Sequence, residues 1–468
     1  MSQSWANYGI DLHLDLAGTR VRAGLEAGLR DAVRSGRLAP GTRLPSTRDL
    51  AADLRIARNT VADAYGQLVA EGWLTARTGA GTWVAERQVA APRPSTPARD
   101  LSGAPRYDLR AGVPANSAFD RRQWLASARA ALNAAPDVVL GYPDPRGLPE
   151  LRTALTGYLA RARGVIASPE NLIICAGFTH GLAMICRVLA ERGANAVAIE
   201  SYGHQTHRSL VAAQGLALLP LPLDASGAAA THAVLDQAGA ALLTPAHQFP
   251  LGMTLAPRRR TAFVDWAARS GGLIIEDDYD GEFRYDRQPV GALQALAPEQ
   301  VVYAGTVSKS LAPGLRLGWL AVPADLTDEV VAAKERSGAH SSVLDQLTLA
   351  RLIGTGGYDR QIRQARISYR RRRDRLAAAL GRHAPGVRLT GIAAGLHAVA
   401  DLPPGCGEAA VVASAASHGV LVDGLGDYAA AEDDARSAIV IGYGRPAEHA
   451  FSTAVSRLCA ALSETQGH

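Results

Sequence analysis

The sequence is poor in the residues that build disulfide frameworks, metal sites and membrane spans. It holds four cysteines, Cys175, Cys186, Cys406 and Cys459, and no two of them form a Cys-x-x-Cys pair. Cysteines so far apart argue against a disulfide framework and a zinc site, and they fit a reducing compartment. No run approaches the roughly 18 apolar residues that a membrane helix needs, and the first residues lack the pattern of a secretion signal. We therefore expect a cytoplasmic protein with no metal and no membrane contact.

Lysine is almost absent, because only Lys309 and Lys334 occur among the 49 basic residues. The net charge of +5 is too mild to indicate a nucleic-acid binder by itself. An arginine side chain keeps its proton in proteins, whereas a lysine amine can lose it and act as a nucleophile. A lysine that is kept where arginine is otherwise used therefore marks a candidate reactive amine.

The length of 468 residues predicts more than one domain. Residues 11–85 are rich in helical patterns and turn signals. Residues 86–106 are rich in proline, alanine and arginine without an apolar period, which indicates a linker. From residue 107 to 468, short apolar runs alternate with helical patterns, and a smaller lobe is expected at about 370–468.

The first zone predicts three short helices followed by a hairpin. Apolar residues recur every four positions between Val21 and Val33, and a capping pattern at Ser46 opens a second helix. A third helix is expected over 58–71. The segments 73–77 and 82–85 enclose the glycine-rich stretch 78–81, which is typical of a hairpin. This order of elements is that of a winged helix-turn-helix.

Such a domain reads DNA with the first residues of its third helix. There, Arg58 suits guanine and Asn59 suits adenine in the major groove. The start of the second helix suits a phosphate, and the glycines of the wing allow close approach to the backbone. The DNA-contacting residues predicted in this way are Ser46, Thr47, Arg48, Arg58, Asn59, Thr60, Arg77, Gly79 and Thr82. The alternative is a small helical domain that dimerises or decorates an enzyme, with these arginines on a solvated face.

The later zone is predicted to be α/β. Buried strands separated by helices indicate a mainly parallel sheet, followed by a small α+β lobe. The strands are expected at 171–175, 196–200, 240–244, 273–277, 301–306 and 317–322, and in the lobe at 397–401 and 439–442, with helices that include 181–191 and 257–270.

Lys309 lies among small residues, and Arg316 follows it with a guanidinium group that suits a phosphate. The hydroxyl groups of Thr306 and Ser308 can add hydrogen bonds. A predicted strand ends at the acidic segment 276–282, where parallel sheets bind ligands. A metal there is the weaker alternative, because no histidine or cysteine has ligand spacing. The segment Gly177, Phe178 and Thr179 opens a helix, which favours an anion.

Together these patterns resemble two known families. Residues 18–85 are similar to the GntR-type winged helix, and residues 107–465 to the fold-type I, class I aminotransferase-like domain that binds pyridoxal 5'-phosphate. This architecture resembles the MocR/GabR-type regulators. The resemblance implies that Lys309 forms the Schiff base, Asp277 pairs with the pyridinium nitrogen and Tyr279 with the phenolic oxygen. It further implies that Arg316 holds the phosphate, His204 stacks on the ring, and Tyr142 reaches the cofactor of a second subunit in a homodimer.

Three positions depart from the aminotransferase pattern. Phe249 stands where an asparagine would reach the phenolic oxygen, and His204 stands where a tyrosine would stack, with Tyr202 as the alternative stacking residue. The arginine that would clamp an amino-acid carboxylate is replaced by Val440, with Arg445 as a possible substitute. An enzyme without that clamp loses the orientation that transamination needs. We therefore expect turnover to be absent, or limited to a vestigial half-transamination.

The sequence thus predicts a transcription regulator that binds double-stranded DNA and senses either pyridoxal phosphate itself, to control vitamin B6 synthesis, or an amino acid or amine at Lys309. One alternative is an active aminotransferase with an accessory N-terminal domain. Another is a DNA-binding protein whose second domain is only a scaffold. The arginine-rich segment 360–375 suits DNA or an acidic partner, although a solvated helix is the simpler interpretation.

Overall fold

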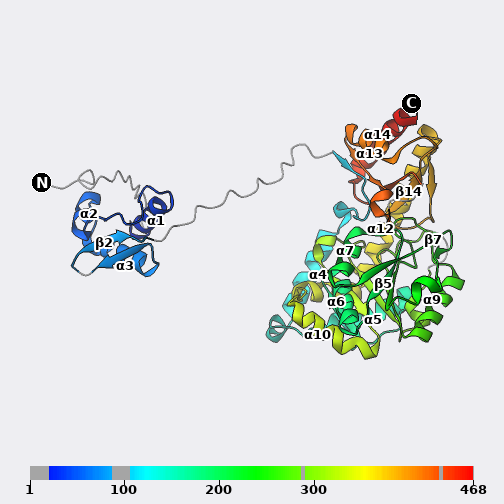
Figure 1. The fold of residues 1–468 in the computed structure, drawn as a ribbon, viewed down its shortest axis with the longest axis horizontal. Coiled ribbons are helices and arrows are strands. Elements are labelled where there is room, and N and C mark those ends of the chain that lie inside the picture. Colours follow the sequence, from blue (N-terminus) through cyan, green and yellow to red (C-terminus); the bar gives the residue numbers. More distant parts are fainter. Residues whose placement is uncertain (1–20, 78, 87–105, 286–289, 432–435, 467–468) are drawn as a thin grey trace. The chain divides into compact units, whose positions relative to one another are not determined.

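The computed structural model describes residues 21–77, 79–86, 106–285, 290–431 and 436–466. The chain divides into two compact units, residues 1–103 and 104–468, and each is described by itself (Figure 1). Residues 11–20 of the predicted DNA-binding domain, Thr78 of its wing and residues 87–105 of the predicted linker lie outside the described residues. In the described part of the chain, no helix is long and apolar enough to span a membrane.

The first unit is a winged helix-turn-helix, as predicted. Its elements are α1 (Val21–Arg34), α2 (Thr47–Leu54), α3 (Arg58–Ala70), β1 (Leu74–Arg77) and β2 (Gly81–Val84). The three helices share a hydrophobic core, to which α1 contributes Leu25, α2 contributes Leu50 and α3 contributes Leu68. The two strands pair antiparallel and form the wing. The apolar stripes found in the sequence are therefore the faces that the helices bury.

Side-chain hydrogen bonds fix the start of α2 against α3. The Ser46 hydroxyl accepts a hydrogen bond from the Asp49 amide at 3.2 Å, which caps α2. The Tyr65 hydroxyl on α3 donates to the Pro45 carbonyl at 3.1 Å. These contacts hold the two helices in the rigid arrangement that a DNA-reading helix requires.

The second unit is built on a seven-stranded sheet with the order β4-β12-β11-β10-β9-β5-β6. Only β12 runs antiparallel to its neighbours β11 and β4, so the predicted parallel character is confirmed. The edge strand β6, with a partly exposed burial pattern, had no recognised sequence signal. The strands are β4 (Leu172–Cys175), β5 (Ala196–Glu200), β6 (Ala217–Leu221), β9 (Ala240–Leu243), β10 (Leu273–Asp277), β11 (Val301–Thr306) and β12 (Gly318–Ala321).

Helices cover both faces of this sheet. In β4, Ile173 packs into the core formed with one set of helices, and Ile174 into the core on the opposite face. The first face is covered by α6 (Phe178–Glu191), α7 (Gln205–Ala213) and α10 (Thr327–Ser337). The other is covered by α5 (Pro149–Arg163), α8 (His232–Leu235), α9 (Pro257–Ser270), α11 (Val343–Gly354) and α12 (Gly357–His383), while α4 (Arg121–Ala134) packs on α11. Burial on both faces explains why these strands are continuously apolar.

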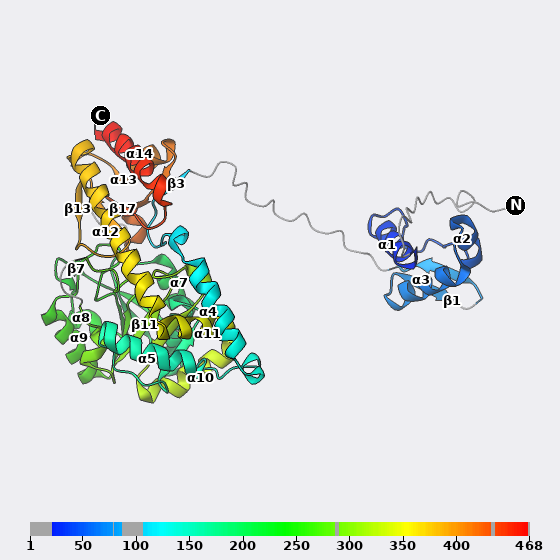
Figure 2. The same ribbon diagram turned by 180° about the vertical axis from the view of Figure 1, so that it is seen from behind.

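A smaller lobe follows, with the four-stranded antiparallel sheet β13-β14-β17-β16. The long helix α12, yellow in Figure 2, joins the main body to this lobe. The lobe contains β13 (Arg388–Thr390), β14 (His397–Asp401), α13 (Glu408–Ser417), β15 (Val420–Leu421), β16 (Asp423–Gly424), β17 (Ala438–Gly442) and α14 (Glu448–Gln466). The strand β3 (Tyr107–Asp108) pairs parallel with β15, so the first described residues after the linker join this lobe. A short hairpin of β7 (Leu223–Asp224) and β8 (Gly227–Ala228) lies on the main body.

The arginine-rich segment 360–375 is part of α12. Most of its arginines are solvent-exposed, but Arg372 is buried and donates hydrogen bonds to the carbonyls of Tyr443, Gly444 and Pro446. Arg372 therefore ties α12 to the small lobe. This arrangement agrees with a solvated helix in which the buried Arg372 has a structural role.

Candidate cofactor pocket and DNA-reading surface

A cavity of about 260 Å³ opens at the carboxyl ends of the parallel strands. Thr306 and Asp277 end two neighbouring strands, and Glu200 ends a third, so a single edge of the sheet brings them together. Of the predicted cofactor residues, the cavity is lined by Lys309, Asp277, Tyr279, Arg316, His204, Phe178, Thr179, Thr306 and Ser308. Segments more than a hundred residues apart in the sequence thus converge on one site.

The Lys309 amine points into this cavity. Its Nζ donates a hydrogen bond to the Gly112 carbonyl at 2.5 Å, and Gly112 also lines the cavity. Burial lowers the pKa of Lys309 below its ordinary value, while Asp277 and Asp280 oppose that shift. A lowered pKa increases the share of neutral amine, which is the form that attacks a carbonyl group.

Asp277 offers an acceptor that the protein leaves unused. Its side chain is buried, and its Oδ1 has no hydrogen-bond partner among the described residues. Burial raises the pKa of Asp277 well above its ordinary value, and Lys309 counteracts this effect. Because buried polar atoms are nearly always paired, an orphaned carboxylate oxygen at a cavity indicates a ligand with an N–H group there.

In the same cavity, Arg316, the start of α6 and the hydroxyl groups at the end of β11 form an anion cradle. The backbone of Arg316 is left-handed, with φ at 50°, and its Nη2 donates to Thr179 Oγ1 at 3.4 Å. A Cβ on Gly177 would lie 3.3 Å from Arg316 Nη1, so glycine leaves the guanidinium room. Among the described residues, no side chain caps the start of α6 at Gly177. Its free N–H groups and the linked hydroxyl groups of Thr306 and Ser308, 2.9 Å apart, suit a phosphate.

Two histidines and a phenylalanine form the aromatic wall of the cavity. The His204 ring stacks on Phe249 with centroids 4.1 Å apart and an angle of 14°. His207, which the sequence analysis missed, contacts both His204 and Phe178 edge-on. Burial lowers the pKa of His204 to about 3 and that of His207 to about 4, so both rings are neutral. The three-residue spacing of these two histidines in the sequence was the signal that could have found His207.

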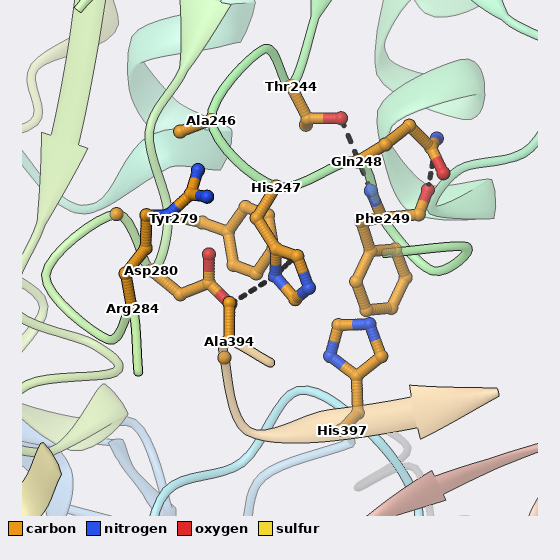
Figure 3. Close-up of polar contacts among 12 residues, drawn as sticks. Thr244, Ala246, His247, Gln248, Phe249, Tyr279, Asp280, Arg284, Ala394 and His397 are labelled. Carbon is orange, nitrogen blue, oxygen red and sulfur yellow. Dashed lines mark hydrogen bonds and ion pairs between the residues drawn. The ribbon is translucent and has the colours of Figure 1, made fainter. Parts of the chain in front are cut away.

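Tyr279 also lines the cavity, but its hydroxyl already has a partner. The Tyr279 oxygen lies 3.0 Å from His247 Nδ1, and Nδ1 lies 2.9 Å from Asp280 Oδ2. Figure 3 shows the His247 ring between Asp280 and the small-lobe residue His397. Phe249, on the same loop as His247, carries no polar group to the cavity. The aminotransferase pattern has two side chains that reach the phenolic oxygen. In this cavity the first position is Phe249, and Tyr279 is the one that keeps a polar group.

Neither of the two positions considered for a carboxylate clamp, Val440 and Arg445, lines this pocket. Val440 is fully buried in an apolar cluster, and Arg445 pairs with Asp108 at 2.7 Å. In the part of the chain that the structure describes, Arg316 is the one arginine lining the cavity. Tyr142 lies fully exposed to solvent and does not line the cavity of its own chain. Its expected role toward a second subunit stays a prediction.

In the first unit, Arg58, Asn59 and Thr60 form the first turn of α3, as expected. Arg58 and Asn59 are exposed, so their polar groups are free to approach base edges. Thr47 and Arg48 begin α2, whereas the predicted phosphate contact of Ser46 competes with its role as the cap of that helix. Gly79 and Thr82 lie on the wing with Arg77.

The wing carries a further arginine that the sequence analysis did not select. The backbone of Arg43 forms an isolated antiparallel bridge with Trp83 of β2, so Arg43 extends the sheet of the wing. The guanidinium groups of Arg43 and Arg77 lie over the Trp83 ring, 5.7 Å and 5.4 Å from its centroid. Arg43 also donates to the Ala80 carbonyl at 2.9 Å. Two cations are therefore held on one exposed face beside the tip of the wing.

Comparison with known proteins agrees with both halves of the chain. Residues 22–84 match the bacterial regulatory proteins of the gntR family, and residues 108–429 match aminotransferase class I and II. The pyridoxine biosynthesis transcriptional regulator PdxR of Corynebacterium glutamicum is 31% identical over 95% of this chain and 96% of its own length. The probable rhizopine catabolism regulatory protein MocR of Rhizobium meliloti is 32% identical over 76% of each chain. The chain belongs to the MocR-type regulators.

This MocR-type regulator therefore combines a DNA-binding winged helix with an aminotransferase-like domain, which confirms the predicted architecture and its α/β fold. The α-aminoadipate aminotransferase of Thermus thermophilus is similar to 78% of this chain and 94% of its own, with a TM-score of 0.69 and 23% identity. At that identity the likeness shows the fold alone. The predicted role as a transcription regulator is confirmed by the family.

Proposed function

We propose that this MocR-type regulator senses pyridoxal 5'-phosphate at Lys309 and that this binding changes the affinity of its winged helix for DNA. The observation that carries the proposal is the convergence of three groups in one cavity: the amine of Lys309, the unpaired carboxylate oxygen of Asp277 and the cradle at Arg316. They suit an aldehyde, a pyridinium N–H and a phosphate. The name of the relative PdxR supports a link to vitamin B6 synthesis.

In this proposal each part of the cofactor has its own partner. Asp277 holds the pyridinium nitrogen, Tyr279 meets the phenolic oxygen and His204 supplies the aromatic surface. The phosphate lies at Gly177, Phe178, Thr179, Thr306, Ser308 and Arg316. When bound, the cofactor would supply an electrophilic aldehyde for the Lys309 amine, and their condensation would release the aldehyde oxygen as water.

The lining of the cavity favours the cofactor itself over an amino acid as the signal. An amino-acid carboxylate needs a second guanidinium group, and in this chain Arg445 is paired with Asp108 while Val440 is buried. Without that clamp, a bound amino acid is not held in the geometry that transamination requires. We therefore propose that sustained aminotransferase turnover is absent.

The Lys309–Gly112 hydrogen bond offers a route from the cavity to the linker. Condensation of this amine with an aldehyde would leave its nitrogen with at most one hydrogen, which would weaken the hydrogen bond that the free Lys309 amine donates to Gly112. Gly112 lies five residues after Tyr107, the first residue of β3. The predicted linker, residues 86–106, directly precedes Tyr107 in the sequence. We propose that release of this carbonyl shifts the segment 107–112 and thereby the linker to the DNA reader.

A homodimer is part of the proposal. Leu125 on α4, Val138 and Leu140 are 66%, 83% and 61% exposed, and exposed apolar side chains that gather in one patch mark an interaction site. Tyr142, two residues beyond Leu140, is exposed as well. A second copy that covers this region would bring Tyr142 to the neighbouring cavity. Sedimentation of the purified chain tests this assembly.

The purified full chain tests the function directly. Pyridoxal phosphate is expected to give a visible band that borohydride fixes on the peptide containing Lys309. Assignment is simple because the only other lysine, Lys334, donates to the Ile174 carbonyl at 2.6 Å and is buried. Pyridoxamine 5'-phosphate is the matched control, because it brings an amine instead of the aldehyde and leaves Lys309 unreacted.

Affinity for an operator fragment, recovered by selection from random duplexes, is then measured with each compound. We expect pyridoxal phosphate to change the affinity and amide exchange over 107–115, and pyridoxamine phosphate to change neither. A colourless protein would support the scaffold alternative. Sustained conversion of an amino acid and an oxo acid would instead support an active aminotransferase.

A further inference from the structure

Tyr279 belongs to a buried hydrogen-bonded group that reaches beyond the cavity. His247 follows β9 by four residues, and Asp280 follows Tyr279 directly. The Nδ1 atom of His247 lies 2.9 Å from Asp280 Oδ2 and 3.0 Å from the Tyr279 oxygen. All three side chains are buried, and Figure 3 shows the carboxylate of Asp280 directed at the imidazole.

The chemistry of these groups fixes where the protons lie. An ionised carboxylate only accepts hydrogen bonds, so the Nδ1 atom that faces Asp280 carries the hydrogen. A protonated Nδ1 cannot accept the hydroxyl proton of Tyr279. Asp280 also attracts the Tyr279 hydroxyl through a side-chain hydrogen bond. By donating to the same carboxylate, His247 competes with that bond and frees the hydroxyl proton for an acceptor in the cavity. Burial and the neighbouring Asp280 and Asp277 raise the pKa of Tyr279 well above its ordinary value, so the hydroxyl stays a donor.

Packing prevents His247 and Asp280 from moving apart. A Cβ on Gly395 would lie 2.5 Å from both His247 Cε1 and Asp280 Oδ2, and Gly395 has a positive φ of 70°. The His397 ring contacts the His247 ring at 5.2 Å and is itself held by the Pro250 carbonyl at 3.0 Å. The small lobe thus encloses the pair against the main body, and such enclosure gives a side chain a single rotamer.

The contacts of His247 and Asp280 behind Tyr279 are important for the cavity because Phe249 supplies no hydrogen-bond donor there. It lies two residues after His247 and brings a ring, stacked on His204, where a polar side chain would provide a donor. The orientation of the Tyr279 hydroxyl therefore depends on the pair behind it. The titratable groups facing Tyr279 are Asp277 and Asp280 on its own segment, Glu200 at the end of β5, His247 after β9 and, behind it, His397 of β14.

We propose that His247, held by Asp280, is a positioning residue that directs the Tyr279 hydroxyl toward the cavity and so sets the acid–base state of the cofactor bound at Lys309. A hydroxyl that donates to the phenolic oxygen stabilises negative charge there, which lowers the pKa of the conjugated system. Loss of the pair weakens that donation and raises this pKa. The inference rests on the proposed function, because it assumes that the cofactor is bound.

The test is a pH titration of the visible band of the full chain loaded with pyridoxal phosphate. We expect His247→Leu to raise the midpoint by roughly half to one pH unit, the size that one hydrogen bond provides. Tyr279→Phe is the reference and should raise it at least as far. His247→Asn places an amide nitrogen where Nδ1 lies, keeps the donor to Asp280 and should stay close to the unaltered chain.

A double variant separates positioning from a general disturbance of the fold. If His247 acts through Tyr279, His247→Leu adds no shift in a Tyr279→Phe background. An unchanged midpoint in the single variants, a further shift in the double variant, or a band that does not titrate while the chain stays folded overturns the inference. Melting of the cofactor-free variants checks folding. Absence of any band in the unaltered chain contradicts the proposed function instead, so the two failures are distinguishable.

Discussion

Arg163 and Asp278 form a buried ion pair beside the strand end that carries Asp277. Arg163 donates to both carboxylate oxygens, at 2.6 Å and 3.0 Å, and Tyr303 donates a third hydrogen bond at 2.7 Å. Removing one partner of a buried pair leaves an uncompensated charge. We expect Arg163→Leu to lower the free energy of unfolding by roughly 3–5 kcal/mol, measured by urea denaturation.

The control for this prediction is an exposed ion pair in the same unit. Arg187 pairs with Glu191 at 3.0 Å, and both side chains are largely exposed. Such surface pairs contribute at most about 1 kcal/mol. If Arg187→Ala and Arg163→Leu cost the same, the buried pair has no special role in stability.

The pKa of Lys309 gives a prediction about the pH dependence of cofactor capture. Only the neutral amine attacks an aldehyde, and burial lowers the pKa of this amine from 10.5. The neutral fraction at a given pH is therefore larger than for an ordinary lysine. We expect the rate at which the visible band forms to rise with pH and to level off below pH 10.5, whereas free N-acetyl-lysine levels off near its ordinary pKa. Coincident profiles would contradict the assignment.

The wing of the DNA reader acts as one structural element in which strand pairing places the charges. Arg43 bridges to Trp83, and Arg77 lies two residues along β1 from Thr75, the partner of Trp83, so the three side chains point to the same face of the wing. We expect the guanidinium groups on this face to contact DNA phosphates. Arg43→Ala should then reduce the slope of log affinity against log salt by about 1 on a random duplex, because each phosphate contact releases a counterion.

Arg37 provides the matched control for the wing. It lies after α1, pairs with Asp31 at 3.5 Å and is also exposed. Arg37→Ala removes the same charge from a different part of the unit. Equal changes in salt slope for the two variants would show that Arg43 acts only through net charge.

The two units of the molecule should contribute different steps to regulation, DNA reading in the first and cofactor sensing in the second. Arg58 belongs to the DNA reader and Lys309 to the aminotransferase-like domain, in different compact units. We expect Arg58→Ala to weaken operator binding by about 1–3 kcal/mol with and without cofactor, and Lys309→Met to abolish the effect of pyridoxal phosphate. Band-shift titrations of both variants and the double variant measure this. A cofactor effect that survives in Lys309→Met would contradict sensing through this amine.

Much of the fold could be predicted because its signals are local. Strands at 196–200, 273–277 and 301–306 were found with their observed limits, since each is a short apolar run bounded by polar or turn residues. The helix 257–270 opens with a proline and ends before a glycine. The strand β6 carries Pro220 and is partly exposed, so its pattern resembled a loop.

The sequence alone determined the residue types at the site: a single reactive lysine between small residues, an arginine after it, and acidic groups at a strand end. Only the tertiary structure decided which of them meet. Gly112 approaches Lys309 across 197 positions, and it does so with a backbone carbonyl, which leaves no trace in the residue type. His247 meets Asp280, and Arg445 is captured by Asp108, because long-range packing selects one partner among many side chains of equal chemistry.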